Sequence, residues 1–267
     1  EMRPGDWSSD VCSSDLSKAK IKYIRSLELK KNRTAEGLFV AEGPKVVGDL
    51  MPTMRLRYVV ATESWLKANH TKIPAEVEVF DVTEEELRKV SYLQTPQEVL
   101  AVFELPGSNA SSAAEFPKDK LSLALDGVQN PGNLGTIIRI ADWFGIENIY
   151  CSQDTADAYN PKVVQATMGS IARVNIIYTD ITKLLTSLPA DYPVYGTLLD
   201  GEDIYAKELS KHGIIVMGNE GNGISQEVRK HVNNRLLIPN FATAADKAES
   251  LNVAIATAIT CSEFRRR

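Results

Sequence analysis

From residue 121 onward, the chain alternates apolar strand-like runs with helical patterns, and this alternation limits its fold more than any other feature. The apolar runs occupy 121–126, 147–152, 172–179, 192–199, 213–218 and 235–240. The helical patterns occupy 136–144, 160–169, 225–232 and 250–264. Strands that alternate with helices form a mostly parallel sheet, because each parallel connection needs a crossover. We therefore predict an α/β domain over 121–267, with helices on both faces of the sheet.

The part of the chain before residue 121 has a different organisation. Short strands are predicted at 38–41, 57–61, 77–80 and 99–103, with helices near 43–51 and 83–90 and a basic amphipathic segment before them. We interpret 17–105 as a small mixed α/β domain. Residues 106–120 carry the Gly, Pro, Ser and Asn that are typical of a linker. Residues 1–16 are rich in Ser and Asp and lack any period, so we interpret them as a non-native extension.

Composition excludes several classes of protein. The 267 residues are 43% hydrophobic and 24% charged, as in ordinary globular chains. No window approaches 18 consecutive apolar residues and no basic segment leads into an apolar one at the start, so we expect a cytoplasmic protein with neither a membrane span nor a secretory signal. The three cysteines and three histidines are widely scattered. This spacing predicts reduced thiols and no metal site.

Positive charge gathers near the start of the first domain. Between residues 17 and 57 there are ten basic and four acidic residues, in a chain whose net charge is −5. A local excess of this kind can neutralise several phosphates of a nucleic acid. Our candidates for RNA contacts are Lys20, Lys22, Arg25, Lys30, Lys31 and Arg33. The charge pattern alone leaves open that these residues form only a solvated helix face.

Three loops that follow apolar strands carry the candidate site, since strand ends are where α/β folds bind ligands. In the first loop, 130–133 (NPGN) predicts a tight turn, and Gly135 precedes an amphipathic helix. Arg139 then falls on about the first turn of that helix, near the loop. A guanidinium held there suits a bidentate grip on phosphate or carboxylate. The alternative is that Arg139 pairs with a neighbouring acid such as Asp142.

The second and third loops offer polar groups of the same kind. Residues 218–223 (GNEGNG) allow close backbone approach to a ligand, but they match neither a dinucleotide-binding nor a Walker motif. Glu220 is either a turn residue or a contact in a site. In the third loop, Ser250 is predicted as the N-cap of the last helix, whose first turn carries Asn252. If buried, Asn252 must be hydrogen-bonded either to the protein or to a substrate.

These loops also carry a resemblance to a known family. The motifs are NPGNLGTIIRIADWFG (130–145), VMGNEGNGIS (216–225) and IPN (238–240) followed by SLNVAIATAI (250–259). In this order and spacing they resemble the SpoU/TrmH-type RNA 2′-O-ribose methyltransferases of the SPOUT superfamily. The resemblance covers 121–267, whereas 17–105 looks like the family's N-terminal substrate-binding domain, which is related to ribosomal protein L30e.

The resemblance implies a trefoil knot, a homodimer with each site near the subunit interface, and S-adenosylmethionine as the cofactor. The residues that would line the catalytic site are Asn133, Arg139, Glu220, Ser250 and Asn252. Those that would bind the cofactor are Leu198, Gly218, Asn219, Ile238, Pro239 and Leu251. The third loop departs from the family pattern, since Asn240 stands where the family usually has Met, and the stretch 240–249 is longer.

The implied reaction is methyl transfer to a ribose 2′-hydroxyl, and we expect 23S ribosomal RNA as the substrate. A sulfonium methyl is already electrophilic, so the enzyme must chiefly align the 2′-oxygen, which can contribute on the order of 7–11 kcal/mol. Because an arginine stays charged, we expect Arg139 to grip a phosphate and to stabilise the developing alkoxide, with Asn133 and Glu220 orienting it. A tRNA 2′-O-methyltransferase, a base-nitrogen methyltransferase and a non-catalytic RNA-binding protein of the same fold are the alternatives.

Overall fold

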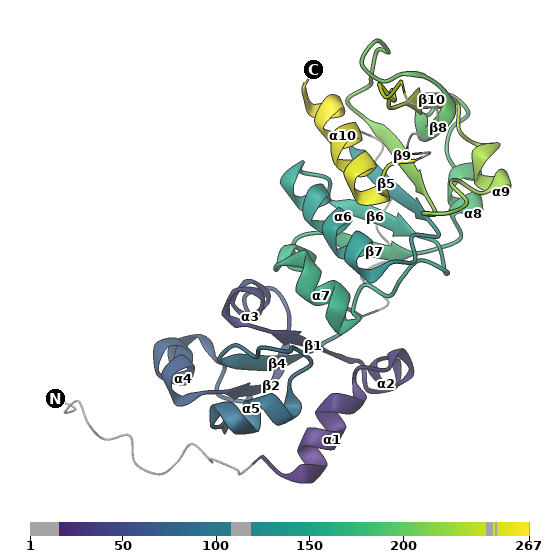
Figure 1. Cartoon of the computed structure of the whole chain (residues 1–267). Coiled ribbons are helices and arrows are strands. Elements are labelled where there is room, and N and C mark those ends of the chain that lie inside the picture. The colour runs from purple at the N-terminus through teal and green to yellow at the C-terminus, as the bar shows by residue number, and fades with distance from the viewer. Residues whose placement is uncertain (1–15, 108–118, 244–247, 249, 267) are drawn as a thin grey trace. The chain divides into compact units, whose positions relative to one another are not determined.

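The computed structural model describes residues 16–107, 119–243, 248 and 250–266, and the chain divides after Pro106 into two compact units (Figure 1). The predicted non-native extension, apart from Leu16, lies outside the described residues. So do most of the predicted linker and half of the loop 240–249. The two units are described separately below.

The N-terminal unit is built on one mixed sheet with the strand order β1-β4-β2-β3. The strands are β1 (Leu38–Glu42), β2 (Leu56–Ala61), β3 (Glu78–Asp81) and β4 (Val99–Glu104). The helices are α1 (Lys18–Ser26), α2 (Lys30–Glu36), α3 (Pro44–Leu50), α4 (Glu63–Asn69) and α5 (Glu84–Val90), with a 3-10 turn η1 (His70–Lys72). Because β4 runs antiparallel to both β1 and β2, and β2 runs parallel to β3, the strands β1, β2 and β3 all end at the same edge.

Each of these three strands is followed directly by a helix, so α3, α4 and α5 all begin at that edge. The start of α5 is fixed by a capping box, in which Thr83 and Glu86 satisfy each other's backbone N–H groups. Buried side chains of α1 and α5, Ile24 and Leu87 among them, join those of the sheet in one apolar core. The predicted strands and the helices near 43–51 and 83–90 are present within a few residues, whereas α2 and α4 were not predicted.

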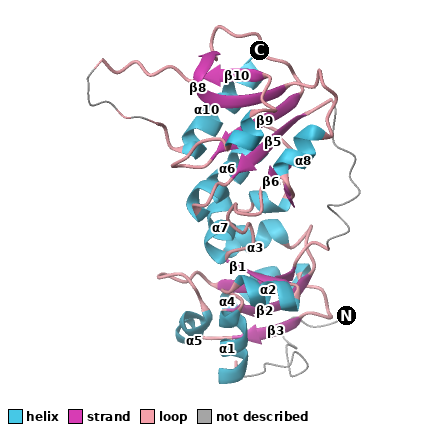
Figure 2. Ribbon diagram, turned by 90° about the vertical axis from the view of Figure 1, so that its right-hand side faces the viewer, coloured by secondary structure: helices cyan, strands magenta, loops and turns pink. Residues whose placement is uncertain are grey.

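The C-terminal unit contains a six-stranded parallel sheet with the order β10-β8-β9-β5-β6-β7 (Figure 2). Its strands are β5 (Leu121–Asp126), β6 (Asn148–Cys151), β7 (Asn175–Tyr178), β8 (Val194–Asp203), β9 (Gly213–Gly218) and β10 (Asn234–Leu237). Its helices are α6 (Pro131–Trp143), α7 (Pro161–Thr167), α8 (Ile181–Thr186), α9 (Gln226–Arg229) and α10 (Val253–Arg266), with a 3-10 turn η3 (Ser170–Ala172).

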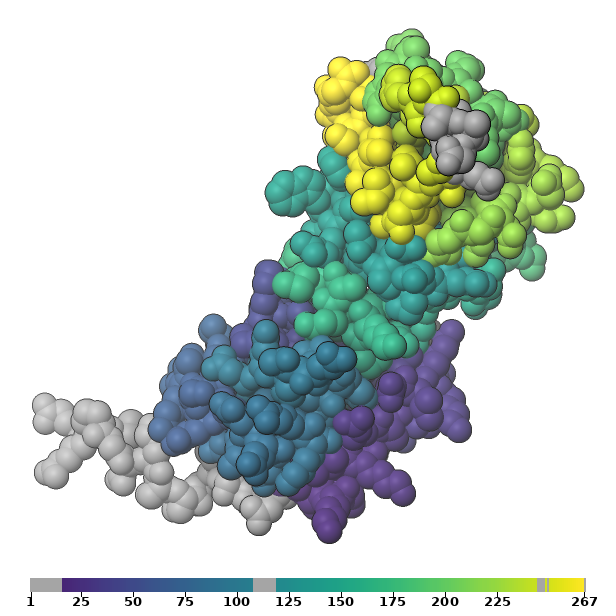
Figure 3. All heavy atoms as spheres, in the orientation of Figure 1, coloured from purple at the N-terminus to yellow at the C-terminus, as the bar shows by residue number. Residues whose placement is uncertain are grey.

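Helices cover both faces of this sheet. On one face, the buried side chains of Ile181 in α8 and Val228 in α9 pack into an apolar cluster with strands β5, β8 and β9. On the other face, Phe264 of α10 packs edge-on against Tyr195 of β8, and α10 also contacts α6. Figure 3 shows α10, in yellow, lying against the teal atoms of α6. The predicted α/β fold, with a parallel sheet and a smaller α/β unit before it, is confirmed; the trefoil knot stays a prediction.

Helix α6 begins five residues earlier than the sequence pattern indicated. The predicted turn 130–133 is instead its first turn, because the Asn130 side chain accepts hydrogen bonds from the N–H groups of Gly132 and Asn133 and Pro131 occupies the first helical position. Gly135 lies inside the helix, where a Cβ atom would come within 2.5 Å of the Ala166 Cβ of α7. This glycine therefore serves close helix packing.

Candidate functional site

The candidate site lies where strands β5, β8, β9 and β10 end, along one edge of the parallel sheet. Strands β5 and β9 are neighbours, with Asp126 paired to Gly218 at their last positions. The loops that follow these two strands are therefore adjacent, and a carboxylate oxygen of Asp126 accepts a hydrogen bond from the N–H of Ser225 at 2.7 Å. The sheet thus brings the first and second predicted loops together.

Glu220 joins the second loop to the start of α6. Its carboxylate accepts hydrogen bonds from the backbone N–H groups of Gln129 (3.3 Å) and Asn130 (3.2 Å), and from the Asn133 side chain (3.0 Å). Partial burial alone would raise the pKa of Glu220, but these hydrogen bonds outweigh burial and hold the pKa below its ordinary value. Glu220 is therefore an ionised acceptor whose contacts are within the protein, which makes it a positioning residue.

Asn252 extends this chain of hydrogen bonds to the last helix. Its side-chain amide donates to the Asn133 Oδ1 atom at 2.9 Å, and its own Oδ1 atom accepts from the N–H groups of Ala254 and Ile255. Asn252 therefore caps α10, and the prediction that Ser250 is the cap is wrong. Three segments that are distant in sequence meet through Asn252, Asn133 and Glu220, and we call this set the Asn–Asn–Glu network.

Arg139 lies on the third turn of α6, exposed, instead of on the first turn as the sequence pattern predicted. The reason is the earlier start of the helix. The alternative pairing with Asp142 is also wrong, because Asp142 forms an ion pair with Arg173 at 2.8 Å. Burial would raise the pKa of Asp142, but the hydrogen bonds from Arg173 and Ser170 lower it below its ordinary value. Within the described part of the chain, no ion pair involves Arg139, so its guanidinium is available to an anion.

Asn219 acts as a clamp on its own loop. Its side-chain nitrogen donates to the Gly127 carbonyl at 2.7 Å, and its side-chain oxygen accepts from the N–H groups of Gly221 and Asn222. A backbone bridge between Asn219 and Gly223 closes the loop. The side chain and the backbone N–H of Asn219 are therefore both occupied by contacts within the protein.

The other predicted cofactor residues lie along the same edge. They are Gly218 at the end of β9, Ile238, Pro239 and Leu251 after β10, and Leu198, which lies inside β8 but two residues beyond the part of that strand that pairs with β9. Large apolar side chains in β8 and after β10 are uncovered: Leu199 is 82% exposed, Phe241 83% and Leu251 51%. Exposed apolar surface of this kind fits the apolar ring of an adenosyl cofactor.

The six basic residues predicted to contact RNA differ in their exposure and in their contacts within the protein. Arg33 is only 1% exposed and donates to the carbonyls of Leu27 and Glu28, so it has no surface on which to meet RNA. Lys20 pairs with Glu78 and lies over the ring of Tyr58.

Arg25 donates to the carbonyls of Lys89 and Ser91, so it too makes contacts within the protein. Lys22, Lys30 and Lys31 are exposed. Contact of these residues with RNA stays a prediction.

Sequence reasoning gave no site role to Asp126 or Arg173. Asp126 ends a buried strand directly before a ligand-type loop, which is a usable signal. No pattern in the sequence pointed to Arg173, because its partner Asp142 lies 31 positions away. Among the described residues, no group of three or more His, Cys, Asp or Glu side chains could hold a metal ion. No helix in the same part of the chain has the length and apolar character needed to cross a membrane.

Comparison with known proteins identifies relatives of both units. The family model described as the SpoU rRNA Methylase family matches residues 120–262, and the MRM3-like substrate binding domain matches residues 18–101. The 23S rRNA (guanosine(2553)-2′-O)-methyltransferase RlmP of Bacillus subtilis is 30% identical, over 92% of this chain and 96% of its own length.

Two solved structures are similar over nearly the whole chain. A putative RNA methyltransferase of the TrmH family from Porphyromonas gingivalis is 43% identical, with a TM-score of 0.85 over 95% of this chain and 99% of its own. The AdoMet-bound rRNA methyltransferase from Sinorhizobium meliloti is 32% identical, with a TM-score of 0.83 over 95% and 96%.

Proposed function

This chain belongs to the SpoU rRNA methylase family, and we propose that it transfers the methyl group of S-adenosylmethionine to a ribose 2′-hydroxyl of large-subunit ribosomal RNA. The observation that carries the proposal is that Arg139 is exposed and forms no ion pair with the described residues, on a helix that the Asn–Asn–Glu network joins to the loop after β9 and to the start of α10. The relatives named above support the choice of ribosomal RNA, because their names specify 23S rRNA or rRNA.

The cofactor would be held at the carboxyl ends of β8, β9 and β10. Its adenosyl group would lie against the apolar side chains there, and the backbone groups of Leu198, Gly218, Ile238 and Leu251 would accept or donate its hydrogen bonds. When bound, it supplies an electrophilic methyl group. The family's usual Met after Ile-Pro is Asn240 in this chain, so that position contributes a polar side chain instead.

The residues of the chain then have to align the 2′-oxygen with that methyl group. Arg139 would contact a phosphate of the target nucleotide and stabilise the negative charge that develops on the 2′-oxygen as its proton passes to solvent. The new O–C bond forms as the S–C bond of the cofactor breaks, which leaves S-adenosylhomocysteine. Asn133 and Glu220 fix the start of α6, and Asn252 ties that start to α10, so the guanidinium is held on a rigid helix. Ser250, which is exposed two residues before Asn252, would contact the ribose.

We propose in addition that the protein acts as a homodimer through α6 and α10. These helices pack on each other, yet Trp143 of α6 is 85% exposed and Ile255 of α10 is 52% exposed. Large apolar side chains that remain uncovered on adjacent helices are typical of a subunit interface. Sedimentation of wild-type protein and of Trp143→Glu tests this, and a monomeric wild-type protein would contradict it.

The function is tested by methyl transfer from labelled S-adenosylmethionine to total RNA from cells that lack the protein. Label in an alkali-resistant dinucleotide from 23S rRNA is the expected result, because a 2′-O-methyl group blocks alkaline cleavage. Label in tRNA would show that tRNA is the substrate in place of 23S rRNA. Label in mononucleotides released by alkali would show methylation of a base and not of a ribose. No transfer by a protein that binds the cofactor would favour a non-catalytic RNA-binding role.

Arg139 is tested by two substitutions in the same assay. Arg139→Ala should bind the cofactor normally in calorimetry and lose methyl transfer, because the phosphate contact and the charge stabilisation are both removed. Arg139→Lys should retain a small part of the activity, since it keeps the charge but not the planar fork. Normal methyl transfer by Arg139→Ala would refute the role.

A further inference from the structure

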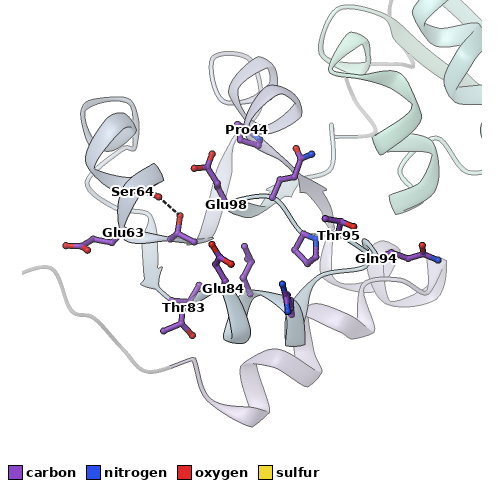
Figure 4. A pocket seen from close by; sticks show the side chains of 14 residues that line it. Pro44, Glu63, Ser64, Thr83, Glu84, Gln94, Thr95 and Glu98 are labelled. Atoms are coloured by element: carbon purple, nitrogen blue, oxygen red, sulfur yellow. Dashed lines mark hydrogen bonds between the residues drawn. The ribbon is translucent and has the colours of Figure 1, made fainter.

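The N-terminal unit holds a cavity that the proposed reaction does not use. Its volume is about 970 Å³, and it lies at the edge where β1, β2 and β3 end (Figure 4). Most of its polar lining carries no charge, with Thr62, Thr83, Gln94, Thr95 and Gln97 among the residues that form it. The size lies within the range of binding sites for small organic groups.

One wall of the cavity is the loop between α5 and β4, and this loop is fixed at both ends. At its start, the buried carboxylate of Glu42 accepts hydrogen bonds from the Ser91 hydroxyl and from the N–H of Tyr92. At its end, the Glu98 carbonyl accepts from the N–H of Thr62 at 2.9 Å. The wall is therefore in place before any ligand arrives, which reduces the ordering cost of binding.

Glu98 occupies a strained position on this wall. Its φ is 34°, and in the described part of the chain only Met168 shares a positive φ among residues other than glycine. Glycine adopts this conformation without the steric cost that a side chain brings. Strain of this kind concentrates at sites where a side chain is needed, which indicates a use for the Glu98 carboxylate at the cavity.

The chemistry of the lining selects a class of ligand. The amides of Gln94 and Gln97 offer both donors and acceptors. The three carboxylates of the lining, Glu63, Glu84 and Glu98, only accept, and Arg88 is the single cation among the lining residues. An excess of carboxylates repels phosphate. The edge of a nucleobase presents amino and imino donors beside carbonyl acceptors, so it matches this lining, and guanine, with two adjacent N–H donors, matches it best.

We propose that this cavity binds an unstacked nucleotide of the RNA substrate, with the base inside it and the phosphates outside. The inference rests on the proposed function and names the part of the N-terminal unit that recognises the RNA. The phosphates would meet the exposed lysines of α1 and α2, and α1 packs against α5 through the contact of Arg25 with the Lys89 carbonyl. Base recognition and charge attraction would thus lie on adjoining parts of one domain.

The test is binding of deproteinised 23S rRNA to the full-length protein, measured by filter retention at several salt concentrations. Gln97→Ala and Glu98→Gly should each weaken binding roughly five- to hundredfold, the range for a specific base contact. The slope of log affinity against log salt should not change, because no phosphate contact is lost. Lys30→Ala/Lys31→Ala should instead reduce that slope, and Glu85→Gln, on the same helix but outside the cavity, should bind as wild type.

The melting temperature of each variant shows whether a loss of RNA affinity reflects lost recognition or lost folding. Glu98→Gly removes backbone strain, so its melting temperature should rise while its RNA affinity falls, a combination that a merely structural role does not produce. Wild-type affinity in both cavity variants, or a reduced salt slope in them, would overturn the proposal. Normal binding of free RNA by the cavity variants, together with weakened binding of ribosomal particles, would also overturn the proposal, because the cavity would then bind a protein. Failure of the wild-type protein to methylate or bind rRNA would instead refute the proposed function.

Discussion

Replacing Glu220 by Gln should disable methyl transfer more than it weakens cofactor binding. The carboxylate accepts three hydrogen bonds, two from backbone N–H groups at the start of α6 and one from Asn133. A glutamine keeps one acceptor oxygen and turns an NH₂ group toward a donor, so at least one bond is lost. Hydrogen bonds to a charged group contribute about 1.5–3 kcal/mol each, and partial exposure here favours the lower end.

A loss of about 1.5–3 kcal/mol in the placement of Arg139 corresponds to roughly a ten- to hundredfold lower rate. The assay is steady-state methyl transfer with saturating 23S rRNA and S-adenosylmethionine, beside calorimetric titration of the cofactor. We expect kcat to fall by that factor and the cofactor affinity to change by less than about threefold, which corresponds to about 0.6 kcal/mol.

The matched control is Glu227→Gln, which removes an exposed carboxylate from the first turn of the nearby α9. It should leave kcat unchanged. Two results would refute the reasoning: wild-type kcat in Glu220→Gln, or an equal loss in Glu227→Gln, which would trace the effect to net charge and not to the network. A Glu220→Gln variant with a greatly weakened cofactor complex would show that the network holds the cofactor loop instead of α6.

Three further predictions concern packing, charge and pH. Gly135→Ala places a methyl group 2.5 Å from a side chain of α7 and should lower stability by about 1–3 kcal/mol, seen as an earlier calorimetric transition. Arg173→Ala frees Asp142 to pair with Arg139 at i and i+3; methyl transfer should fall, and adding Asp142→Ala should restore it. Burial raises the pKa of Glu42, although hydrogen bonds from Ser91 and Tyr92 act to lower it. Its contribution to stability is therefore full below the unfolded-state pKa and declines as pH rises through the folded-state pKa. Glu42→Gln should flatten this decline in melting experiments between pH 4 and 8, and an unchanged dependence of melting temperature on pH would contradict the reasoning.

Much of the fold could be predicted from the sequence because it depends on local patterns. The apolar runs of β5 and β9 are buried on both sides and bounded by Asn and Gly, which indicates a parallel strand without further information. The three loop motifs could be placed together for the same reason, since parallel strands end at one edge of the sheet.

What could not be predicted depends on contacts between distant residues. The start of α6 was misplaced because NPGN reads equally well as a turn and as a capped first turn. Arg33 looked like a surface cation, yet nearby carbonyls hold its guanidinium inside the domain. The pairing of Asp142 with Arg173, 31 positions away, decides whether Arg139 is free, and no local pattern encodes it.

The Asn–Asn–Glu network has a consequence for the time at which the enzyme becomes competent. Asn133 and Asn252 are 119 positions apart in the chain. At a synthesis rate of about 5–20 residues per second, roughly 6–24 s pass between the two being made. During that interval the nascent chain already carries Arg139 but lacks the residue that ties α6 to α10. The network can therefore be completed only after Asn252 has been made.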